Sequence, residues 1–501
     1  MGLQLRVNWR VSLRLVGGVL KWLSIPLTFP LLIAIYDGDP LVPLLVPVVL
    51  SAGVGLGLER LSSDEPMYTR ETYLMVTLSW LVVALVGALP FILAGNGALG
   101  SPVNALFESM SGITTTGATI ITDFGIHDRS IMMWRQVIQW LGGLGILVLA
   151  ISVLSQLSVG GAQLMETESQ TQDVQKLTPR IEETARLIWK LYAGITALAA
   201  VCLFALGLVG VAPNMDAYNA LSHALTAVAT AGFSPQPDSV GAFSPAAQWL
   251  IIPFMFIGAT NFILIYFFIN GDWGRPIRNE EFRFYLGLVV GASVLMAMLL
   301  VVDPDITTSG LEETMRLATF QVVSMLTTTG FATVDFNAWS PAAKHILFLS
   351  MFLGGMAGST TCSIKLLRWL IILKSFRRDL YTTVHPEAIT PVRLSDSAVD
   401  EETIRDVYAY TMLSLVIFIF ATVFVVVDSA RIGLGLTEFE GLSAAAATFF
   451  NIGPAFGIAG PFGSYAPFSD MTKGVMILLM YVGRLEIIPV LVLFTRSFWQ
   501  S

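Results

Sequence analysis

Long apolar stretches separated by short polar segments recur along the whole chain. A helix needs about 20 residues to cross a hydrocarbon core of about 30 Å. Stretches of that length predict ten membrane-crossing helices, at residues 14–36, 41–59, 72–95, 131–157, 185–211, 246–270, 281–302, 342–373, 405–428 and 472–497. The pattern therefore predicts an all-α polytopic membrane protein.

Four further apolar segments are too short or too polar to cross. Each lies between two long spans, at residues 103–114, 217–229, 312–327 and 438–450. Such segments are typical of re-entrant half-helices. Irregular backbone at membrane depth is tolerated only where protein or a water-filled cavity covers it. We therefore expect the four segments to face one another around a shared path.

The order span, half-helix, polar string and span occurs four times after the first two helices. The copies align at Gly117, Gly232, Gly330 and Gly453, which are 115, 98 and 123 residues apart. Internal repetition of this kind predicts four related units in a pseudo-fourfold arrangement, preceded by an extra helix pair. The predicted segments are the N-terminal pair 1–66 and the pore repeats 67–160, 161–274, 275–380 and 381–501.

A short string with a central glycine follows each half-helix. The first to fourth strings read Thr-Thr-Thr-Gly-Ala-Thr at 114–119, Ala-Thr-Ala-Gly-Phe-Ser at 229–234, Thr-Thr-Thr-Gly-Phe-Ala at 327–332 and Phe-Asn-Ile-Gly-Pro-Ala at 450–455. A dehydrated potassium ion needs several oxygen ligands, which backbone carbonyls of short loops can supply. Glycine accepts backbone angles closed to other residues. Each half-helix would also aim its negative C-terminal end at the ion.

The strings therefore predict a four-part carbonyl filter for K+. Its predicted residues are Thr115, Thr116, Gly117, Ala118, Thr230, Ala231, Gly232, Phe233, Thr328, Thr329, Gly330, Phe331, Asn451, Ile452, Gly453 and Pro454. For one string alone, a loop with a helix C-cap glycine is the better interpretation. Four copies after four half-helices favour the filter. The fourth string differs most from the others, so we expect that quarter to coordinate less well.

Composition and charge agree with a membrane protein and orient it. The 501 residues are 54% hydrophobic and 13% charged, against about 25% charged in soluble domains. Basic residues gather at 6–21, 60–70, 176–190, 275–283 and 365–378, whereas the intervening loops are acidic. The positive-inside rule then predicts cytoplasmic termini. We expect a multi-pass protein of the cell inner (plasma) membrane whose first helix is retained.

Neither a metal centre nor an enzyme is indicated. Cys202 and Cys362 both lie in apolar context, and the four histidines show no ligand spacing. The only metal expected is K+ at the filter, as transported substrate, and no organic cofactor is expected. An intramembrane enzyme has no support, because the sequence has no His-Glu-x-x-His, Gly-x-Ser-x-Gly or Gly-x-x-x-x-Gly-Lys motif.

A run of glycines and hydroxyls interrupts the apolar stretch 342–373. It contains Gly354, Gly355, Gly358, Ser359, Thr360 and Thr361. One interpretation is an unwound loop below the filter that blocks or opens the path, since hydroxyls can satisfy freed backbone groups. The other is tight helix packing through a small-xxx-small pair. The residues alone leave both open.

Three basic residues near this run and in the last span have two interpretations each. Arg484 lies inside an apolar stretch, where a charge costs roughly 2.5–3.5 kcal/mol. It either faces the pore below the filter or is a snorkelling or structurally paired arginine. Lys365 and Arg368 either lie near the inner mouth of the path or are ordinary positive-inside residues that anchor the helix at the membrane surface. The polar stretch 165–183 is either a docking surface for a regulator or a solvated loop.

The chain resembles the TrkH/KtrB family of potassium transporters over nearly its whole length. The residues that carry the resemblance are Gly-Ile-Thr-Thr-Thr-Gly-Ala-Thr at 112–119, Asn-Ile-Gly-Pro at 451–454 and Gly-Arg-Leu-Glu-Ile at 483–487. The extra helix pair and the ending Leu-Phe-Thr-Arg-Ser-Phe-Trp at 493–499 are more similar to the TrkH branch. The resemblance implies a homodimer with one pore per protomer, gated by a cytoplasmic nucleotide-binding ring of the TrkA type.

The same resemblance bears on the gate and on the choice of ion. It implies that the glycine and hydroxyl run is an intramembrane gate loop and that Arg484 acts with it. It also implies that serine in place of the first filter glycine goes with sodium transport, and this chain has Gly117 there. We therefore expect a potassium uptake protein without nucleic-acid partners, with a sodium or mixed potassium/sodium transporter as the alternative.

Overall fold

The computed structural model describes residues 7–61, 68–152, 181–303, 306, 309–395 and 397–499. These residues form helices almost throughout, and the chain divides into two compact units, each described by itself. Unit 1 comprises Met1–Gly142, Ala231–Ser239 and Ala421–Ser501, and unit 2 comprises Gly143–Thr230 and Val240–Phe420.

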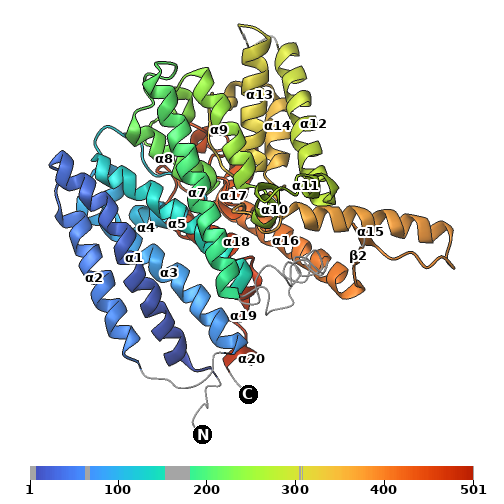
Figure 1. Ribbon diagram of the computed structural model, residues 1–501, viewed down its shortest axis with the longest axis horizontal. Helices are drawn as coiled ribbons and strands as arrows, with labels where there is room; N and C mark the ends of the chain where they lie inside the picture. The colour runs from blue at the N-terminus through green and yellow to red at the C-terminus, as the bar shows by residue number, and fades with distance from the viewer. Residues whose placement is uncertain are drawn as a thin grey trace. The chain divides into compact units, whose positions relative to one another are not determined.

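Unit 1 contains the N-terminal helix pair and the helices around the first and fourth strings (Figure 1). Its elements are α1 (Trp9–Asp37), α2 (Val42–Glu59), α3 (Thr69–Ala94), η1 (Gly97–Gly100), α4 (Pro102–Ile113), the first part of α5 (Arg129–Ser152), the second part of α16 (Glu401–Arg431), α17 (Glu438–Phe449), η5 (Gly457–Ala459), α18 (Asp470–Arg484), α19 (Ile488–Val492) and α20 (Arg496–Trp499). Helix α4 packs between α3 and α18, and α17 packs on α18.

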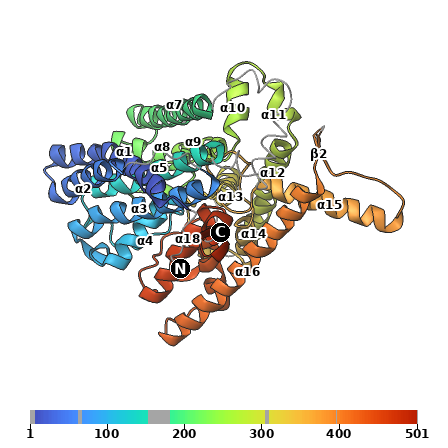
Figure 2. The same cartoon turned by 90° about the horizontal axis from the view of Figure 1, so that it is seen from below.

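Unit 2 contains the helices around the second and third half-helices. Its elements are the rest of α5, α7 (Ile181–Leu208), α8 (Ala217–Val228), α9 (Pro245–Gly258), α10 (Phe262–Ile269), α11 (Gly274–Arg278), α12 (Glu280–Val302), α13 (Leu311–Leu326), η4 (Phe336–Ala338), α14 (Pro341–Ser350), α15 (Leu366–Val384), the strands β1 (Arg393–Leu394) and β2 (Ser397–Ala398), and the first part of α16, with η3 (Ser239–Ala242) at the boundary. The strands pair antiparallel, with Arg393 opposite Ala398. The far end of α15 extends away from the rest of the unit in both views, whereas the hairpin returns to the start of α12, where Ser395 N donates to Glu280 (Figure 2).

The four predicted half-helices are confirmed to within one residue. Helices α4, α8 and α17 have 12 residues and α13 has 16, which at 1.5 Å per residue is too short to cross a membrane. Their starts follow local signals. Pro102 begins α4, Asp216 caps α8 by accepting from Asn219 N at 2.7 Å, and Thr437 and Glu440 form a capping box at α17. These three half-helices therefore begin where their own sequences set the start.

Three of the ten predicted spans are not continuous helices. Among the described residues, six helices are long and apolar enough to cross a membrane, and a seventh candidate is the pair α9 and α10, bent by 107°. The predicted spans 246–270, 342–373 and 472–497 are broken at residues 259–261, 351–365 and 485–487. Hydropathy counts apolar residues without testing helical continuity, so an unbroken helix was the wrong prediction at 246–270 and 472–497. At 342–373 the break agrees with the unwound loop that the glycine and hydroxyl run had left open.

Helices α1 and α2 cross at two glycines. A Cβ added to Gly55 would lie 2.5 Å from Lys21 N and 2.7 Å from Gly17 O. A Cβ added to Gly53, on the same helix, would have nothing within 4 Å. The backbones of α1 and α2 therefore approach as closely as small residues allow, as in other membrane helix pairs. Lys21 and Glu59 add an ion pair at 2.6 Å across the same contact.

We predict that Gly55→Ala destabilises this helix pair and that Gly53→Ala does not. Alanine favours a helix at both positions, but at residue 55 the new methyl group forces the backbones apart, at a cost of about 1–3 kcal/mol. Thermal unfolding of the detergent-purified protein, followed by tryptophan fluorescence, should give a lower midpoint for Gly55→Ala. Equal midpoints for the two variants would contradict the tight crossing.

Candidate functional site

All four strings adopt one backbone conformation. The residue two before each glycine is left-handed although it is not glycine, with φ of 55° at Thr115, 49° at Thr230, 51° at Thr328 and 56° at Asn451. The glycines that follow have φ of 80°, 81°, 79° and 101°. Left-handed backbone costs roughly 1–2 kcal/mol for a residue with a side chain. Unequal sequences thus share the same strained turn.

The string glycines are not the helix caps. The Thr116 N–H bonds to Ser111 O, and the Thr329 N–H bonds to Ser324 O, each at 2.9 Å. A bond from an N–H to the carbonyl five residues earlier is typical of a Schellman motif. The left-handed capping residue of the motif directly precedes the donor and is here Thr115 or Thr328. Each glycine lies two residues beyond the cap. The interpretation of the strings as ordinary C-cap glycines is therefore wrong, and the second left-handed position needs another reason.

In unit 1, the glycines allow neighbouring strings to approach. A Cβ added to Gly117 would lie 2.4 Å from Ala231 O of the second string. One added to Gly453 would lie 2.6 Å from Thr116 O of the first string. Neither position tolerates a side chain unless backbone moves. Parts of the first, second and fourth strings therefore meet backbone to backbone in unit 1, and the third string belongs to unit 2.

The string side chains turn toward the surrounding protein. Thr116 Oγ1 lies 2.7 Å from Thr114 Oγ1, and the same pairing joins Thr327 and Thr329 at 2.7 Å. In the fourth string, Asn451 Nδ2 donates to Thr116 Oγ1 at 2.8 Å and to Met480 O at 2.9 Å. Asparagine thus takes the same backbone position as the threonines and ties its string to the first one.

Three backbone carbonyls of the predicted filter residues already accept a hydrogen bond. Ala231 O accepts from Gln139 Nε2 at 2.6 Å, Phe331 O from Ser324 Oγ at 2.6 Å, and Gly453 O from the Tyr465 hydroxyl at 2.8 Å. A carbonyl oxygen has two lone pairs, so each retains one for a further partner. These bonds fix the directions of the three carbonyls.

Two titratable groups outside the spans, His127 and Tyr465, are neutral near pH 7. Burial lowers the pKa of His127 to about 4, helped by the positive charge of Arg135 and opposed by Asp123. Burial also raises the pKa of the Tyr465 hydroxyl well above its usual range. His127 and Tyr465 therefore add no charge next to the strings.

The glycine and hydroxyl run forms a non-helical loop between α14 and α15. Helix α14 ends at Ser350 and α15 begins at Leu366, so packing of Gly354 and Gly358 within one helix is excluded. Thr360 Oγ1 lies 2.9 Å from Thr230 Oγ1 and donates to Gly258 O at 2.9 Å. The loop therefore lies directly against the left-handed threonine of the second string.

The same loop also contacts the third string. The Cys362 N–H donates to Thr328 Oγ1 at 3.1 Å. In both strings that it reaches, the loop bonds the hydroxyl two residues before the glycine. A movement of this loop would therefore change the support of two strings together.

The break between α9 and α10 holds this loop from the other side. Met356 N donates to Ala259 O at 3.0 Å, and Asn261 Nδ2 donates to Ala357 O at 2.8 Å. Glu281 of α12 accepts from Ala357 N at 2.8 Å. Two unwound segments thus satisfy each other's backbone groups, as buried irregular backbone requires.

Two basic residues follow the loop, and neither extends to solvent as an anchor. Lys365 Nζ donates to both oxygens of Thr361, to Oγ1 at 2.9 Å. Arg368 is buried, with its guanidinium 3.9 Å from the centre of the Tyr410 ring. Lys365 therefore braces the end of the loop, and Arg368 packs in the interior of unit 2.

Arg484 is the last residue of α18 and is only 1% exposed. Its Nη2 donates to Gly142 O of α5 at 2.8 Å, and its guanidinium lies 5.6 Å from the centre of the Trp80 ring. The chain then breaks at Glu486 and Ile487, which both have positive φ. Arg484 is thus held inside unit 1 and does not snorkel toward the membrane surface.

Sequence reasoning missed three residues that contact the first and second strings. Glu108 of α4 and Arg135 of α5 form an ion pair at 2.7 Å, with exposures of 0% and 1%. Gln139 lies one turn further along α5 and contacts the second string. The repeat register held a signal, because Glu108 and Gln321 both lie nine residues before a string glycine.

Comparisons with known proteins agree with this architecture. The family model for TrkH, described as a cation transport protein, matches residues 47–501. The potassium uptake protein TrkH of the Trk system from Halomonas elongata is 35% identical over 99% of this chain and 100% of that protein. The TrkH protein of Escherichia coli strain K12 is 33% identical over 94% of this chain and 98% of that protein.

A solved structure is similar over the whole length. The crystal structure of the potassium transporter TrkH from Vibrio parahaemolyticus superposes with a TM-score of 0.87 at 31% identity. The match covers 99% of this chain and 100% of that chain.

Proposed function

The chain belongs to the TrkH family of cation transport proteins, and we propose that it is the gated, ion-conducting subunit of a potassium uptake system. The family consists of transporters and not of enzymes. The named relatives are potassium uptake proteins of 33–35% identity over 94–99% of this chain.

The shared backbone of the four strings is the observation that carries this proposal. Potassium would lose its water to carbonyl oxygens of the strings, one set from each of the repeats 67–160, 161–274, 275–380 and 381–501, which follow the helix pair 1–66. The predicted filter residues named above supply these oxygens. The repeated left-handed turn before each glycine supports this role, because no single local sequence explains it. Strain at such positions is typical of functional sites.

Potassium is the ion that this filter favours. Gly117 and Gly453 have no room for a side chain, since an added Cβ would meet carbonyl oxygens of neighbouring strings at 2.4 and 2.6 Å. A serine at position 117 would push these carbonyls apart or tilt them. A sodium or mixed potassium/sodium pathway is the alternative, and ion flux decides between them.

The loop Gly354 to Ser363 is the gate in this proposal. Its contacts with Thr230 and Thr328 support a place on the inner side of two strings. Its residues Gly354, Gly355, Gly358, Ser359, Thr360 and Thr361 give a segment rich in glycine and hydroxyl groups. The positive charge of Arg484 acts as a further barrier to cations on the same path.

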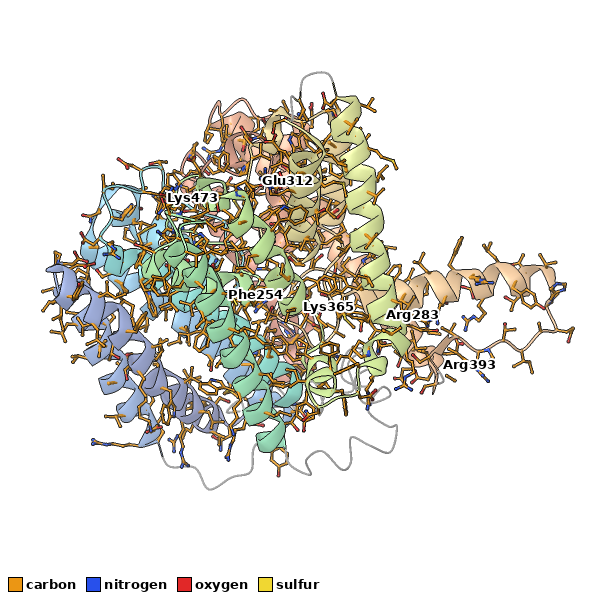
Figure 3. The ribbon with its side chains drawn as sticks, turned by 45° about the horizontal axis from the view of Figure 1, so that its top comes forward. Phe254, Arg283, Glu312, Lys365, Arg393 and Lys473 are labelled. Atoms are coloured by element: carbon orange, nitrogen blue, oxygen red, sulfur yellow. The ribbon has the colours of Figure 1, made fainter. Side chains whose placement is uncertain are left out.

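The protein is a multi-pass component of the plasma membrane with cytoplasmic termini in this proposal. Charges within unit 2 support the orientation: Arg283 and Arg393 lie at one end of the unit and Glu312 at the other (Figure 3). By the positive-inside rule, the end with the two arginines is cytoplasmic.

A second copy of this chain covers an apolar stripe on α15. Leu373, Phe376, Leu380 and Val384 are 51–72% exposed and recur every three or four residues. This spacing places them on one face of the helix. An exposed stripe of this kind, on a helix that extends from its unit, supports the homodimer.

A cytoplasmic nucleotide-binding ring of the TrkA type is the proposed regulator. A cluster of buried apolar side chains behind the gate loop supports a route by which binding of the ring would reach the gate. The cluster joins Ala357 of the loop, Ile371 of α15, Val392 before the hairpin and Val407 of α16. A partner that binds α15 or the hairpin would therefore contact elements that pack on the same cluster as the gate loop. The polar stretch 165–183, the other candidate docking surface, lies outside the described residues except for the start of α7.

We predict that the purified protein in liposomes passes potassium and rubidium in preference to sodium, and that Gly117→Ser lowers this preference. The potassium-to-sodium permeability ratio should fall by about tenfold, since 1.4 kcal/mol of lost discrimination has that effect. Gly53→Ala is the control, because an added methyl group there meets nothing. An unchanged ratio in Gly117→Ser would refute the filter assignment, and no ion flux from the parent protein would refute the function.

We predict that removing residues 356–359 raises potassium flux without changing the permeability ratio. The deletion removes the contacts with Ala259, Asn261 and Glu281. Glu281→Ala should raise flux less, whereas Glu281→Gln keeps an acceptor for Ala357 N and should match the parent. Flux that stays level or falls in the deletion variant would favour a purely structural loop.

We predict that Phe376→Asp with Leu380→Asp converts the dimer to monomers. Two carboxylates in the centre of an apolar interface would be buried without partners, at a cost of several kcal/mol. Crosslinking in native membranes measures the oligomeric state, and Thr382→Ala, on the side of α15 opposite the stripe, is the control. A persistent dimer in the double variant would show that the stripe faces something else.

A further inference from the structure

A buried carboxylate holds the outer end of the first string. Glu108 Oε2 accepts from Ile120 N at 2.8 Å, and Oε1 accepts from Thr119 Oγ1 at 3.0 Å. Thr119 and Ile120 are the second and third residues after Gly117. Glu108 is 0% exposed. This carboxylate therefore fixes the chain just beyond the first glycine.

A buried guanidinium joins that carboxylate to the second string. Arg135 Nε donates to Glu108 Oε1 at 2.7 Å, and Nη1 donates to Ser234 O at 3.1 Å. Nη2 lies 3.3 Å from Thr119 Oγ1. The guanidinium also lies 4.1 Å from the centre of the Phe233 ring. Phe233 and Ser234 directly follow Gly232, so one rigid planar group touches the outer ends of both strings.

The next turn of α5 holds the second string on both sides of its glycine. Gln139 Nε2 donates to Ala231 O at 2.6 Å, and Gln139 Oε1 accepts from Phe233 N at 3.0 Å. Residues four apart lie on the same face of a helix. Arg135 and Gln139 therefore form one rigid edge of α5 that sets where the second string lies relative to the first.

Burial of the Arg135–Glu108 ion pair costs free energy that packing of apolar side chains would not cost. Two charges taken out of water are tolerated only when good geometry and further hydrogen bonds satisfy them. Here the hydrogen-bond partners of the ion pair are Thr119 and Ser234 of the strings and Ile120, the residue directly after the first string. Apolar side chains could fill the same volume but could not orient these backbone groups.

We propose that Arg135, Glu108 and Gln139 are positioning residues for ion selectivity, because they fix the spacing between the carbonyls of the first and second strings. The proposal rests on the function proposed above. The three residues do not touch the ion in this scheme. They act through the Ala231 carbonyl and through the string ends, so their loss changes which ion fits and not whether a path exists.

The test is the potassium-to-sodium permeability ratio of full-length variants in liposomes. Arg135→Lys keeps the positive charge but replaces a fork of donors by a point charge, which cannot reach Glu108, Thr119 and Ser234 together. We expect the ratio to fall by about tenfold, as for one lost charge-assisted hydrogen bond. Because the charge is kept, a fall would report geometry and not the local field.

A milder variant covers the case in which Arg135→Lys fails to fold. Thr119→Val keeps the shape of the side chain and removes the hydroxyl between Glu108 and Arg135. Its ratio should fall by about threefold. Arg431→Lys is the matched control, since Arg431 pairs in the same unit with the buried Asp428, which also accepts hydrogen bonds from Ser469 and Thr472.

The outcomes separate this inference from the proposed function. A lower ratio in Arg135→Lys or Thr119→Val, with the parent ratio in Arg431→Lys, supports the positioning role. The parent ratio in both variants, together with a lowered ratio in Gly117→Ser, overturns the positioning role and leaves the filter intact. An unchanged ratio in all of them, Gly117→Ser included, overturns the filter and this inference with it.

Discussion

Backbone groups at membrane depth must find their hydrogen bonds inside the protein, and this constraint governs every irregular segment of the chain. Bilayer lipid offers no donors or acceptors, so an unwound segment survives only if another part of the protein satisfies it. The strings rely on the carbonyls at the ends of their half-helices, as with Thr116 and Ser111. The loop between α14 and α15 and the break between α9 and α10 rely on each other through Met356, Ala259 and Asn261. Irregular segments therefore occur in mutually dependent sets.

That dependence explains how four unequal strings keep one conformation. Thr115 and Asn451 differ in chemistry, yet both take the left-handed position that ends a half-helix. Asn451 bonds its side-chain amide to Thr116 and Met480 of the surrounding protein, so the backbone oxygens are the chemistry that the strings share. An ion that binds carbonyls does not distinguish Thr from Asn at that place. Sequence divergence among the repeats is therefore compatible with a single ion-binding geometry.

Buried charge in unit 1 follows the same logic. Arg135 and Glu108 are buried together beside the first two strings, and Arg484 lies against Gly142 and Trp80 at the end of α18. In a chain with only 13% charged residues, each such group is costly and is retained where other parts of the protein satisfy its hydrogen bonds. Charges in these positions therefore mark the segments on which transport would depend.

The sequence by itself determined the fold class, the four half-helices and the string glycines, because hydropathy, helix-capping residues and repeat spacing are local properties. It also indicated an interruption in the stretch 342–373 but left a packed helix possible. Only the tertiary structure decided that this stretch unwinds, that α9 and α10 meet at 107°, and that Thr115 and not Gly117 caps its half-helix. The partnership of Glu108 with Arg135 was equally out of reach, since the two lie 27 residues apart on different helices. Such pairings depend on which segments meet in the folded protein, and the hydropathy pattern does not specify this.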